Sequence, residues 1–256
     1  MKPHAAYRPG HSFLHRLHPL VKAGWLLAAT IAFFVLQQSW AIAIMLAVIV
    51  AAYPLNNLRL REIPGTQIAV VTAMALGGLQ LIFNRNGAVL TSLGPITITR
   101  MGAQAAVVVA GRFLSVVLLS YLFVLTTDPN DLAYGLMQVG LPYRYGFALI
   151  TALRLVPIFE REAQRVYQAQ VVRGAGYGVK GPRRLFALIR QFALPMLSSA
   201  LGKVDSLAVS MEGRGFGRHP TRTFYRPRSF ARRDSLGLVG LAAFVILVFV
   251  IRIALT

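Results

Sequence analysis

The sequence contains no cysteine and only eight acidic residues, against 27 Lys and Arg residues. The absence of cysteine excludes disulfides, thiolate metal sites and cysteine nucleophiles. The few carboxylates are mostly placed as helix caps or beside Arg, which gives little material for acid–base catalysis at a membrane. The chain also lacks a phosphate loop of the G-x-x-x-x-G-K type, so we expect it neither to bind ATP nor to catalyse a reaction, and to need no cofactor.

Charged residues make up only 14% of the chain, whereas a soluble domain usually has about a quarter. Hydrophobic residues make up 56% and the mean hydropathy is +0.59. Several apolar runs approach or exceed the roughly 18 residues that indicate a membrane span. The composition therefore predicts an all-α membrane protein. The first 22 residues are polar and basic, and they do not resemble a cleavable signal peptide.

The apolar runs predict about five transmembrane helices. Residues 20–55 are too long for one span and are interrupted at Gln37, Gln38 and Ser39, which indicates a hairpin of two short spans. Further spans are expected at about 63–83, 103–125 and 236–255, with an external loop or short hairpin at 84–102. Lys and Arg flank both ends of the first hairpin, so we expect the N-terminus to be cytoplasmic.

The basic residues are concentrated in one stretch. Of the 27 Lys and Arg residues, 17 lie between Arg144 and Arg233, on long helical patterns between spans. Binding to nucleic acid would favour aromatic residues interleaved with the charge, so we expect the charge to reflect membrane topology and no nucleic-acid partner. The expected organisation is a membrane domain at 1–125, a cytoplasmic helical region at 126–234 and a C-terminal transmembrane helix at 235–256.

The cytoplasmic region begins with a short amphipathic helix from Pro129, with an apolar stripe at Leu132, Leu136 and Val139. Two long amphipathic helices follow, at about 143–173 and 182–213, each with an internal proline (Pro157 and Pro195) that should kink it. The predicted apolar stripe of the first is Leu149, Leu153, Val156, Phe159, Ala163 and Val166. That of the second is Leu185, Leu188, Phe192, Leu201, Val204, Ala208 and Met211.

Both long helices end in the same way, as Val172-Arg173-Gly174 and as Gly213-Arg214-Gly215. Gly just beyond a last turn, with Arg facing the negative end of the helix dipole, is also an ordinary helix ending. The repetition favours a second interpretation, in which each end presents an Arg fork to a groove in a partner protein. Two such ends would suit two equivalent grooves, as a two-fold dimer offers.

These motifs resemble the transmembrane T component of energy-coupling factor (ECF) transporters, the vitamin and metal importers of bacteria and archaea. That family has two Ala-Arg-Gly motifs at the ends of long coupling helices, and here Val172 and Gly213 stand in place of Ala. The resemblance covers nearly the whole chain. It extends to Leu17-His18-Pro19 with Lys22, Thr126-Thr127-Asp128-Pro129, Gly140-Leu141-Pro142, Arg154-Leu155-Val156-Pro157, Ala169-Gln170, and Asp205, Ala208, Met211 and Glu212.

The resemblance implies that Arg173-Gly174 and Arg214-Gly215 dock into two ATP-binding cassette ATPase subunits. It also implies that the two kinked coupling helices cross beneath a separate substrate-binding (S) membrane subunit, and that the protein lies in the cytoplasmic membrane of a bacterium or archaeon. The cargo, whether biotin, another vitamin, cobalt or nickel, would be chosen by that other subunit and is not encoded here.

Other interpretations remain open. A conventional permease that binds its own substrate would have polar or charged residues clustered at mid-membrane, and Arg112 is the one charge in the middle of a predicted span. We interpret Arg112 as structural. A membrane-embedded enzyme would need carboxylates, His or a Ser-Lys pair near the membrane. His11 and His15 have a spacing that two metal ligands could use, but no carboxylate or Cys lies near, so we expect no metal site.

Overall fold

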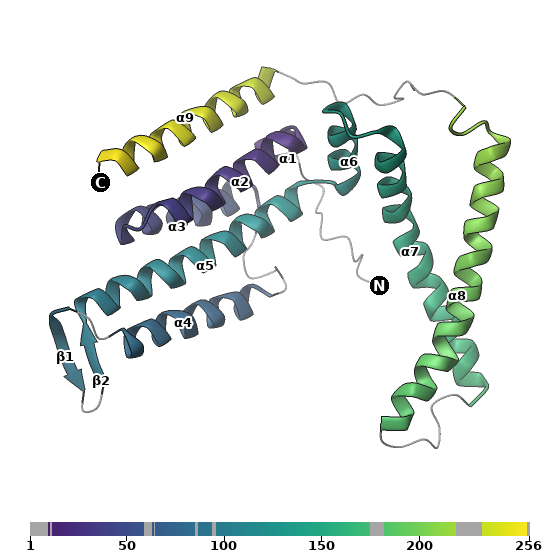
Figure 1. Cartoon of the computed structure of the whole chain (residues 1–256), viewed down its shortest axis with the longest axis horizontal. Coiled ribbons are helices and arrows are strands. Elements are labelled where there is room, and N and C mark those ends of the chain that lie inside the picture. The colour runs from purple at the N-terminus through teal and green to yellow at the C-terminus, as the bar shows by residue number, and fades with distance from the viewer. Residues whose placement is uncertain are drawn as a thin grey trace. The chain divides into compact units, whose positions relative to one another are not determined.

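The computed structural model describes residues 10, 12–58, 63, 65–84, 87–93, 96–174, 182–218 and 232–254. It divides into two compact units, one formed by residues 1–135 and 228–256 and the other by residues 136–227. The elements in chain order are α1 (Phe13–Arg16), α2 (Pro19–Val35), α3 (Ser39–Leu55), α4 (Thr66–Phe83), β1 (Val89–Leu93), β2 (Ile96–Thr99), α5 (Arg100–Thr126), α6 (Pro129–Gln138), α7 (Tyr143–Val172), α8 (Pro182–Gly213) and α9 (Arg232–Ala254) (Figure 1).

The expected class, an all-α membrane protein, is confirmed. Among the described residues, four helical segments are long and apolar enough to span a membrane: α4, α5, α9 and the part of α8 from Ile189 to Gly213. The segment predicted as a hairpin of two short spans contains two apolar helices, α2 and α3, which have 17 residues each and are about 25 Å long. They are shorter than the four segments above, and their crossing of the membrane stays a prediction. The segment predicted as a loop or short hairpin contains the antiparallel pair β1 and β2, in which Leu93 faces Ile96.

The first unit exposes large apolar side chains around its helices, as lipid requires. Leu27, Ile31, Val48 and Ile68 are each more than 60% exposed. A soluble protein rarely exposes so much contiguous apolar surface, whereas acyl chains solvate it well. The helices of this unit lie side by side, with the hairpin of β1 and β2 at one end of α4 and α5 (Figure 1).

Helices α4 and α5 pack closely because small residues line their contact. Ala69, Ala73 and Gly77 recur every four residues along α4 and are buried. A Cβ built on Gly77 would lie 3.2 Å from the Cβ of Ala110, so a larger residue would push the helices apart. Small residues at this spacing let transmembrane backbones approach each other and pack without a hydrophobic driving force.

Helices α2 and α5 run in opposite directions with a fixed register. Nζ of Lys22 donates to the carbonyl oxygen of Thr126 at 2.7 Å, and Nη2 of Arg112 donates to that of Leu36 at 3.4 Å. Fourteen residues separate the two contacts on each helix, so the register holds over about 21 Å. The core between α2, α3 and α5 includes Phe33 and Tyr53, which are both fully buried.

Helix α9 runs parallel to α2, so the last span joins the first unit. The backbone N–H of His18 donates to Oδ1 of Asp234 at 2.7 Å, and Nε1 of Trp25 donates to the carbonyl oxygen of Gly237 at 3.0 Å. A Cβ on Gly237 would lie only 2.9 Å from the side chain of Val21. The two helices therefore start at the same end and touch through glycine.

In the second unit, α7 and α8 run antiparallel, as Figure 1 shows. The rings of Tyr167 and Phe192 stack with centroids 5.7 Å apart, and Nζ of Lys203 lies 3.1 Å from a carboxylate oxygen of Glu162. The bounds of both helices match the expected ranges closely. Both prolines lie inside continuous helices, and the kinks expected at them stay predictions.

Two predicted apolar stripes are only partly buried in the structure. On α6 the buried residues are Ala133 and Met137, whereas Val139 is 69% exposed. Gly135 is also buried, and a Cβ there would lie 3.2 Å from His18 and from Leu20, so the helix approaches these residues through a position without a side chain. On α8 the predicted stripe is divided. Phe192 packs on α7, whereas Leu201 and Val204 are more than half exposed.

Candidate functional site

The end of α7 is a glycine cap that places Arg173 directly after the last helical residue. Arg173 is the C-cap residue, and Gly174 follows it with a φ of 79°. The N–H of Gly174 donates to the carbonyl oxygen of Val171 at 2.9 Å. A residue with a Cβ would be strained by about 1–2 kcal/mol in this left-handed conformation, which explains why glycine stands here.

The end of α8 has the same geometry, with one further hydrogen bond. Gly215 has a φ of 67°, and its N–H donates to the carbonyl oxygen of Glu212 at 2.9 Å. The N–H of Phe216 donates to the carbonyl oxygen of Met211, also at 2.9 Å. These two bonds form a Schellman motif, in which Arg214 is again the C-cap residue. The two Arg-Gly pairs therefore occupy equivalent positions on their helices.

Both helix ends are open to a partner. The side chains of Arg173 and Arg214 are exposed. A Cβ built on Gly174 or Gly215 would meet no heavy atom within 4 Å, so glycine is required there by its φ and not by crowding. Each guanidinium follows the carbonyl end of a long helix, where the dipole is negative and holds a cation favourably. An exposed planar fork at such a position suits a carboxylate or a carbonyl-lined groove.

The caps at Arg173 and Arg214 lie at opposite ends of the antiparallel pair of α7 and α8. The ring of Phe216, two residues after Arg214, packs against Phe147 with centroids 4.5 Å apart, and against Tyr143 at 5.8 Å. Phe147 precedes Arg173 by 26 residues on α7. At 1.5 Å per residue, the two arginines are therefore separated by about 39 Å along the helix.

The contact between α7 and α8 contains an ion pair that is only partly shielded from water. Glu162 accepts from Lys203, whose Nζ also donates to Oγ of Ser199 at 2.9 Å, and Arg165 lies 3.6 Å away. The hydrogen bond from Lys203, followed by that from Ser199, lowers the pKa of Glu162 below its ordinary value. The carboxylate is therefore charged whenever the two helices are in contact at neutral pH.

One face of α8 is apolar and uncovered. Leu194, Leu197, Leu201 and Val204 follow one another at steps of three and four residues, and each is between 53% and 59% exposed. This spacing places them on one side of the helix. We call these four residues the α8 leucine stripe. They do not take part in the ring stacking or in the ion pair with α7.

Several buried polar residues of the membrane unit have structural partners that local patterns in the sequence did not predict. Lys22 and Asp234 are buried and hydrogen-bond to residues 104 and 216 positions away. Arg112 donates to the carbonyl oxygen of Leu36, the C-cap residue of α2, and its guanidinium lies 5.1 Å from the centroid of the Phe34 ring. The interpretation of Arg112 as structural agrees with these contacts. For Asp234, the sequence signal of a structural role was its position as the one acidic residue at the start of an apolar helix.

The histidines near the start have local roles. Nδ1 of His15 lies 2.6 Å from Oγ of Ser12, and Nδ1 of His18 accepts from the N–H of Leu20 as the cap of α2. His4 and His11 lie outside the described residues. Within the part of the chain that the structure describes, no three His, Asp or Glu residues are grouped as metal ligands would be.

Comparison with known proteins gives a consistent result. The family model CbiQ, described as a cobalt transport protein, matches residues 10–225. The chain is 30% identical to the energy-coupling factor transporter transmembrane protein EcfT of Leuconostoc gelidum over 95% of this chain and 94% of that protein. It is 29% identical to EcfT of Streptococcus equi, over 96% and 95% respectively.

A third relative is longer. A putative ABC transporter ATP-binding protein of Bifidobacterium longum is 30% identical over 88% of this chain, which corresponds to only 30% of that protein's length. A region similar to this chain therefore occurs there in one polypeptide with other sequence. The match to the family model covers most of the chain, and the EcfT relatives match over almost its full length. The chain thus belongs to the family of energy-coupling factor transporter transmembrane proteins represented by CbiQ and EcfT.

Proposed function

We propose that this membrane protein is the energy-coupling subunit of an ATP-driven importer for a vitamin or a transition-metal ion. In this role it would transmit conformational changes of two ATP-binding cassette subunits to a separate substrate-binding membrane subunit. The observation that carries the proposal is the pair of equivalent caps at Arg173 and Arg214, about 39 Å apart along one antiparallel helix pair. If the Arg-Gly geometry served only to end a helix, the second helix would not need to end with the same geometry.

The proposed partners of the two caps are the grooves of two ATPase subunits, one for each arginine. A two-fold dimer offers two equivalent grooves at a fixed distance, and two exposed Arg forks match that arrangement. The relative from Bifidobacterium longum supports an ATP-binding partner, because a region similar to this chain lies within a protein named as ATP-binding. ATP hydrolysis would then belong to the partner subunits, and this chain would be non-catalytic.

The proposed contact for the substrate-binding subunit is the α8 leucine stripe. Its four side chains present a continuous apolar face, and helices recognise each other through such faces. Helices α7 and α8 can transmit movement to this face only if ATP favours one separation of the two ends over another. The ion pair of Glu162 and Lys203 would change little in free energy during such a movement, because partly solvated pairs contribute weakly.

We further propose that the N-terminus and the coupling helices α7 and α8 are cytoplasmic, in a bacterial or archaeal cell membrane. The support is the concentration of Lys and Arg between Arg144 and Arg233, since cytoplasmic segments next to spans carry an excess of these residues. Labelling of single introduced cysteines in intact cells would test the orientation, because the chain has no cysteine of its own.

The decisive test of the coupling proposal is the double variant Arg173→Ala/Arg214→Ala. We expect it to insert into the membrane but to lose co-purification with the ATPase subunits and to lose ATP-driven uptake. The matched control is Arg154→Ala/Arg165→Ala, which removes two exposed arginines from α7 away from both ends and should keep assembly and uptake. Normal assembly and uptake in the first double variant would contradict the proposal.

A further inference from the structure

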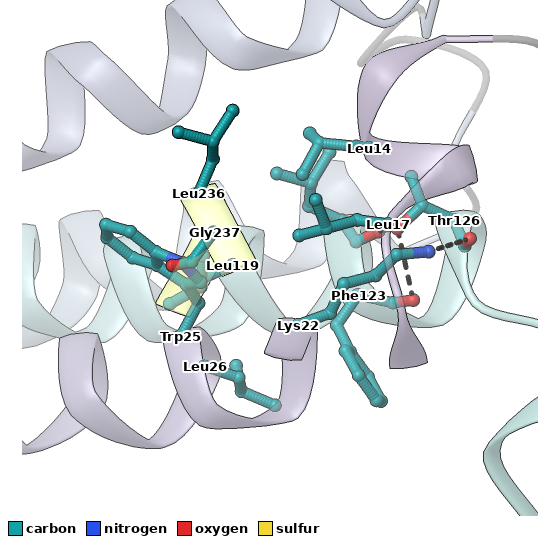
Figure 2. A pocket seen from close by; sticks show the side chains of 11 residues that line it. Leu14, Leu17, Lys22, Trp25, Leu26, Leu119, Phe123, Thr126, Leu236 and Gly237 are labelled. Atoms are coloured by element: carbon teal, nitrogen blue, oxygen red, sulfur yellow. Dashed lines mark hydrogen bonds between the residues drawn. The ribbon is translucent and has the colours of Figure 1, made fainter. Parts of the chain in front are cut away.

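A cavity of about 360 Å³ lies within the membrane unit, between α1, α2, α5 and α9 (Figure 2). Its walls are apolar and include Leu17, Trp25, Leu119 and Leu236. Leu236 is 69% exposed, so the cavity opens to the surface of the unit at α9. An apolar cavity of this size gains little from water, because water needs several polar partners. An apolar chain would fill it favourably.

One cationic residue lines this cavity, and three more lie next to lining residues in the chain. Lys22 lines it with its alkyl stem, and its ammonium group is directed to the carbonyl oxygen of Thr126 (Figure 2). Arg16, the last residue of α1, lies in the chain between the lining residues Leu14 and Leu17. Arg232 and Arg233 lie within about one turn of Leu236 on α9. All three arginines are exposed.

Asp128 follows Thr126 by two residues, and its carboxylate accepts from the N–H of Asn130. The acidic residue next to the arginines of α9 is Asp234. Its carboxylate is buried and accepts from the backbone N–H of His18, so it is directed inward to α2. Four cations against these two carboxylates leave a net positive charge at this end. Apolar walls with cationic residues next to one end match a molecule with an apolar chain and an anionic head.

We propose that this cavity binds one acyl chain of an anionic phospholipid from the surrounding bilayer, with the phosphate of its headgroup held by Arg16, Arg232 and Arg233. The proposal commits to a lipid because the exposed apolar helices of this unit place the opening of the cavity in contact with bilayer. It commits to an anionic lipid because basic pockets between membrane helices select such headgroups. A bound lipid would stabilise the contact of α9 with α2, since both helices form the walls.

Trp25 provides a direct reporter, because the chain has only two tryptophans and the other, Trp40, lies 52% exposed at the start of α3. The protein with Trp40→Phe is placed in nanodiscs of neutral phosphatidylcholine. A small fraction of the lipid carries bromine on its acyl chains and has either a phosphatidylglycerol or a phosphatidylcholine headgroup. Bromine quenches the fluorescence of an indole that it touches, so quenching reports the occupancy of the cavity.

We expect brominated phosphatidylglycerol to quench Trp25 at a much lower mole fraction than brominated phosphatidylcholine. The double variant Arg232→Gln/Arg233→Gln changes only exposed side chains, and it should reduce this preference by about fivefold for each arginine that contributes. In the matched protein with Trp25→Phe, the remaining Trp40 should be quenched equally by both lipids.

Two results would overturn the proposal. Equal quenching of Trp25 by both brominated lipids would show that the cavity has no preference for an anionic headgroup. Quenching of Trp40 without any quenching of Trp25 would show that lipid does not enter the cavity. Neither result would affect the coupling proposal, which is tested at Arg173 and Arg214.

Discussion

The ammonium group of Lys22 donates to the carbonyl oxygen of Thr126, so a residue in the first turn of α2 binds the last turn of α5. Both groups are buried, with exposed fractions of 6% and 2% for the two residues. The contact satisfies a carbonyl that has no partner within its own helix, and it places a cation at the negative end of the α5 dipole.

Replacing Lys22 by Met should therefore destabilise the membrane unit although the side-chain volume is nearly kept. A hydrogen bond to a charged group contributes about 1.5–3 kcal/mol, and its loss also leaves the carbonyl of Thr126 unsatisfied in an apolar environment. We expect a lower midpoint of thermal unfolding in detergent. The control is Lys203→Met, whose ammonium group is partly exposed and which should have a much smaller effect. Equal effects of both variants would show that burial of Lys22 is not what makes the contact important.

The effect of replacing a glycine near the two caps by alanine should depend on the backbone angle φ of that glycine. Gly174→Ala and Gly215→Ala place a Cβ at positive φ, so each should weaken the last helical turn by about 1–2 kcal/mol. Gly213→Ala lies inside α8 with nothing within 4 Å of the added Cβ, so it should stabilise that turn by up to about 1 kcal/mol. Hydrogen exchange of the last-turn amides measures the difference. Faster exchange in all three variants would contradict the assignment of the caps.

The contact of α9 with α2 should tolerate alanine at one glycine and not at another. A Cβ on Gly237 would lie 2.9 Å from Val21, whereas a Cβ on Gly240 would lie 3.4 Å from the ring of Trp25, which is ordinary contact. We expect Gly237→Ala to cost about 1–3 kcal/mol through overpacking and Gly240→Ala to cost much less. Thermal unfolding in detergent distinguishes them, and identical behaviour would mean that α9 shifts easily along α2.

The pairing of α7 with α8 should weaken in acid. The partners of Glu162 lower its pKa, so the charged form is favoured while the helices are in contact. The contribution is fully present above the ordinary pKa of about 4.5 and is lost as the pH falls through the lowered value. Spin labels on Cys introduced at Val172 and Gly213 would report the separation of the two ends as the pH is lowered. In Glu162→Gln the change should disappear; an unchanged pH response there would assign it to another group.

The separation of the two ends should also respond to nucleotide. With the same pair of spin labels in the assembled complex, we expect a distribution near 39 Å that shifts when ATP binds to the partner subunits. The labelled protein is simple to prepare because no native cysteine has to be removed. A distribution that is identical with and without ATP would rule out transmission through a change in this separation.

Local patterns in the sequence were sufficient for the helices and their ends. Gln37, Gln38 and Ser39 predicted the break between α2 and α3, and the Arg-Gly pairs predicted where α7 and α8 end. These features depend on residues within a few positions of each other, such as a glycine with positive φ.

The faces of the helices could not be predicted in the same way. Leu201 belongs to a regular apolar pattern that looks like a core stripe, but its helix uses Phe192 and Lys203 to contact α7 and leaves the leucines exposed. Periodicity shows that a face is apolar and not what covers it. The contacts of Lys22 with Thr126 and of His18 with Asp234 join residues more than 100 positions apart, so no local pattern carries them.

The packing of Phe216 on Phe147 makes the two helix ends mechanically different although their caps are alike. The end at Arg214 is tied through these rings to the start of α7, whereas Arg173 lies about 39 Å further along the same helix. One polypeptide with two unlike ends cannot have the symmetry of a partner dimer with two like grooves. Any such complex is therefore asymmetric even if its ATPase subunits are identical, and the two nucleotide sites should differ in how strongly each is coupled to movement of α7.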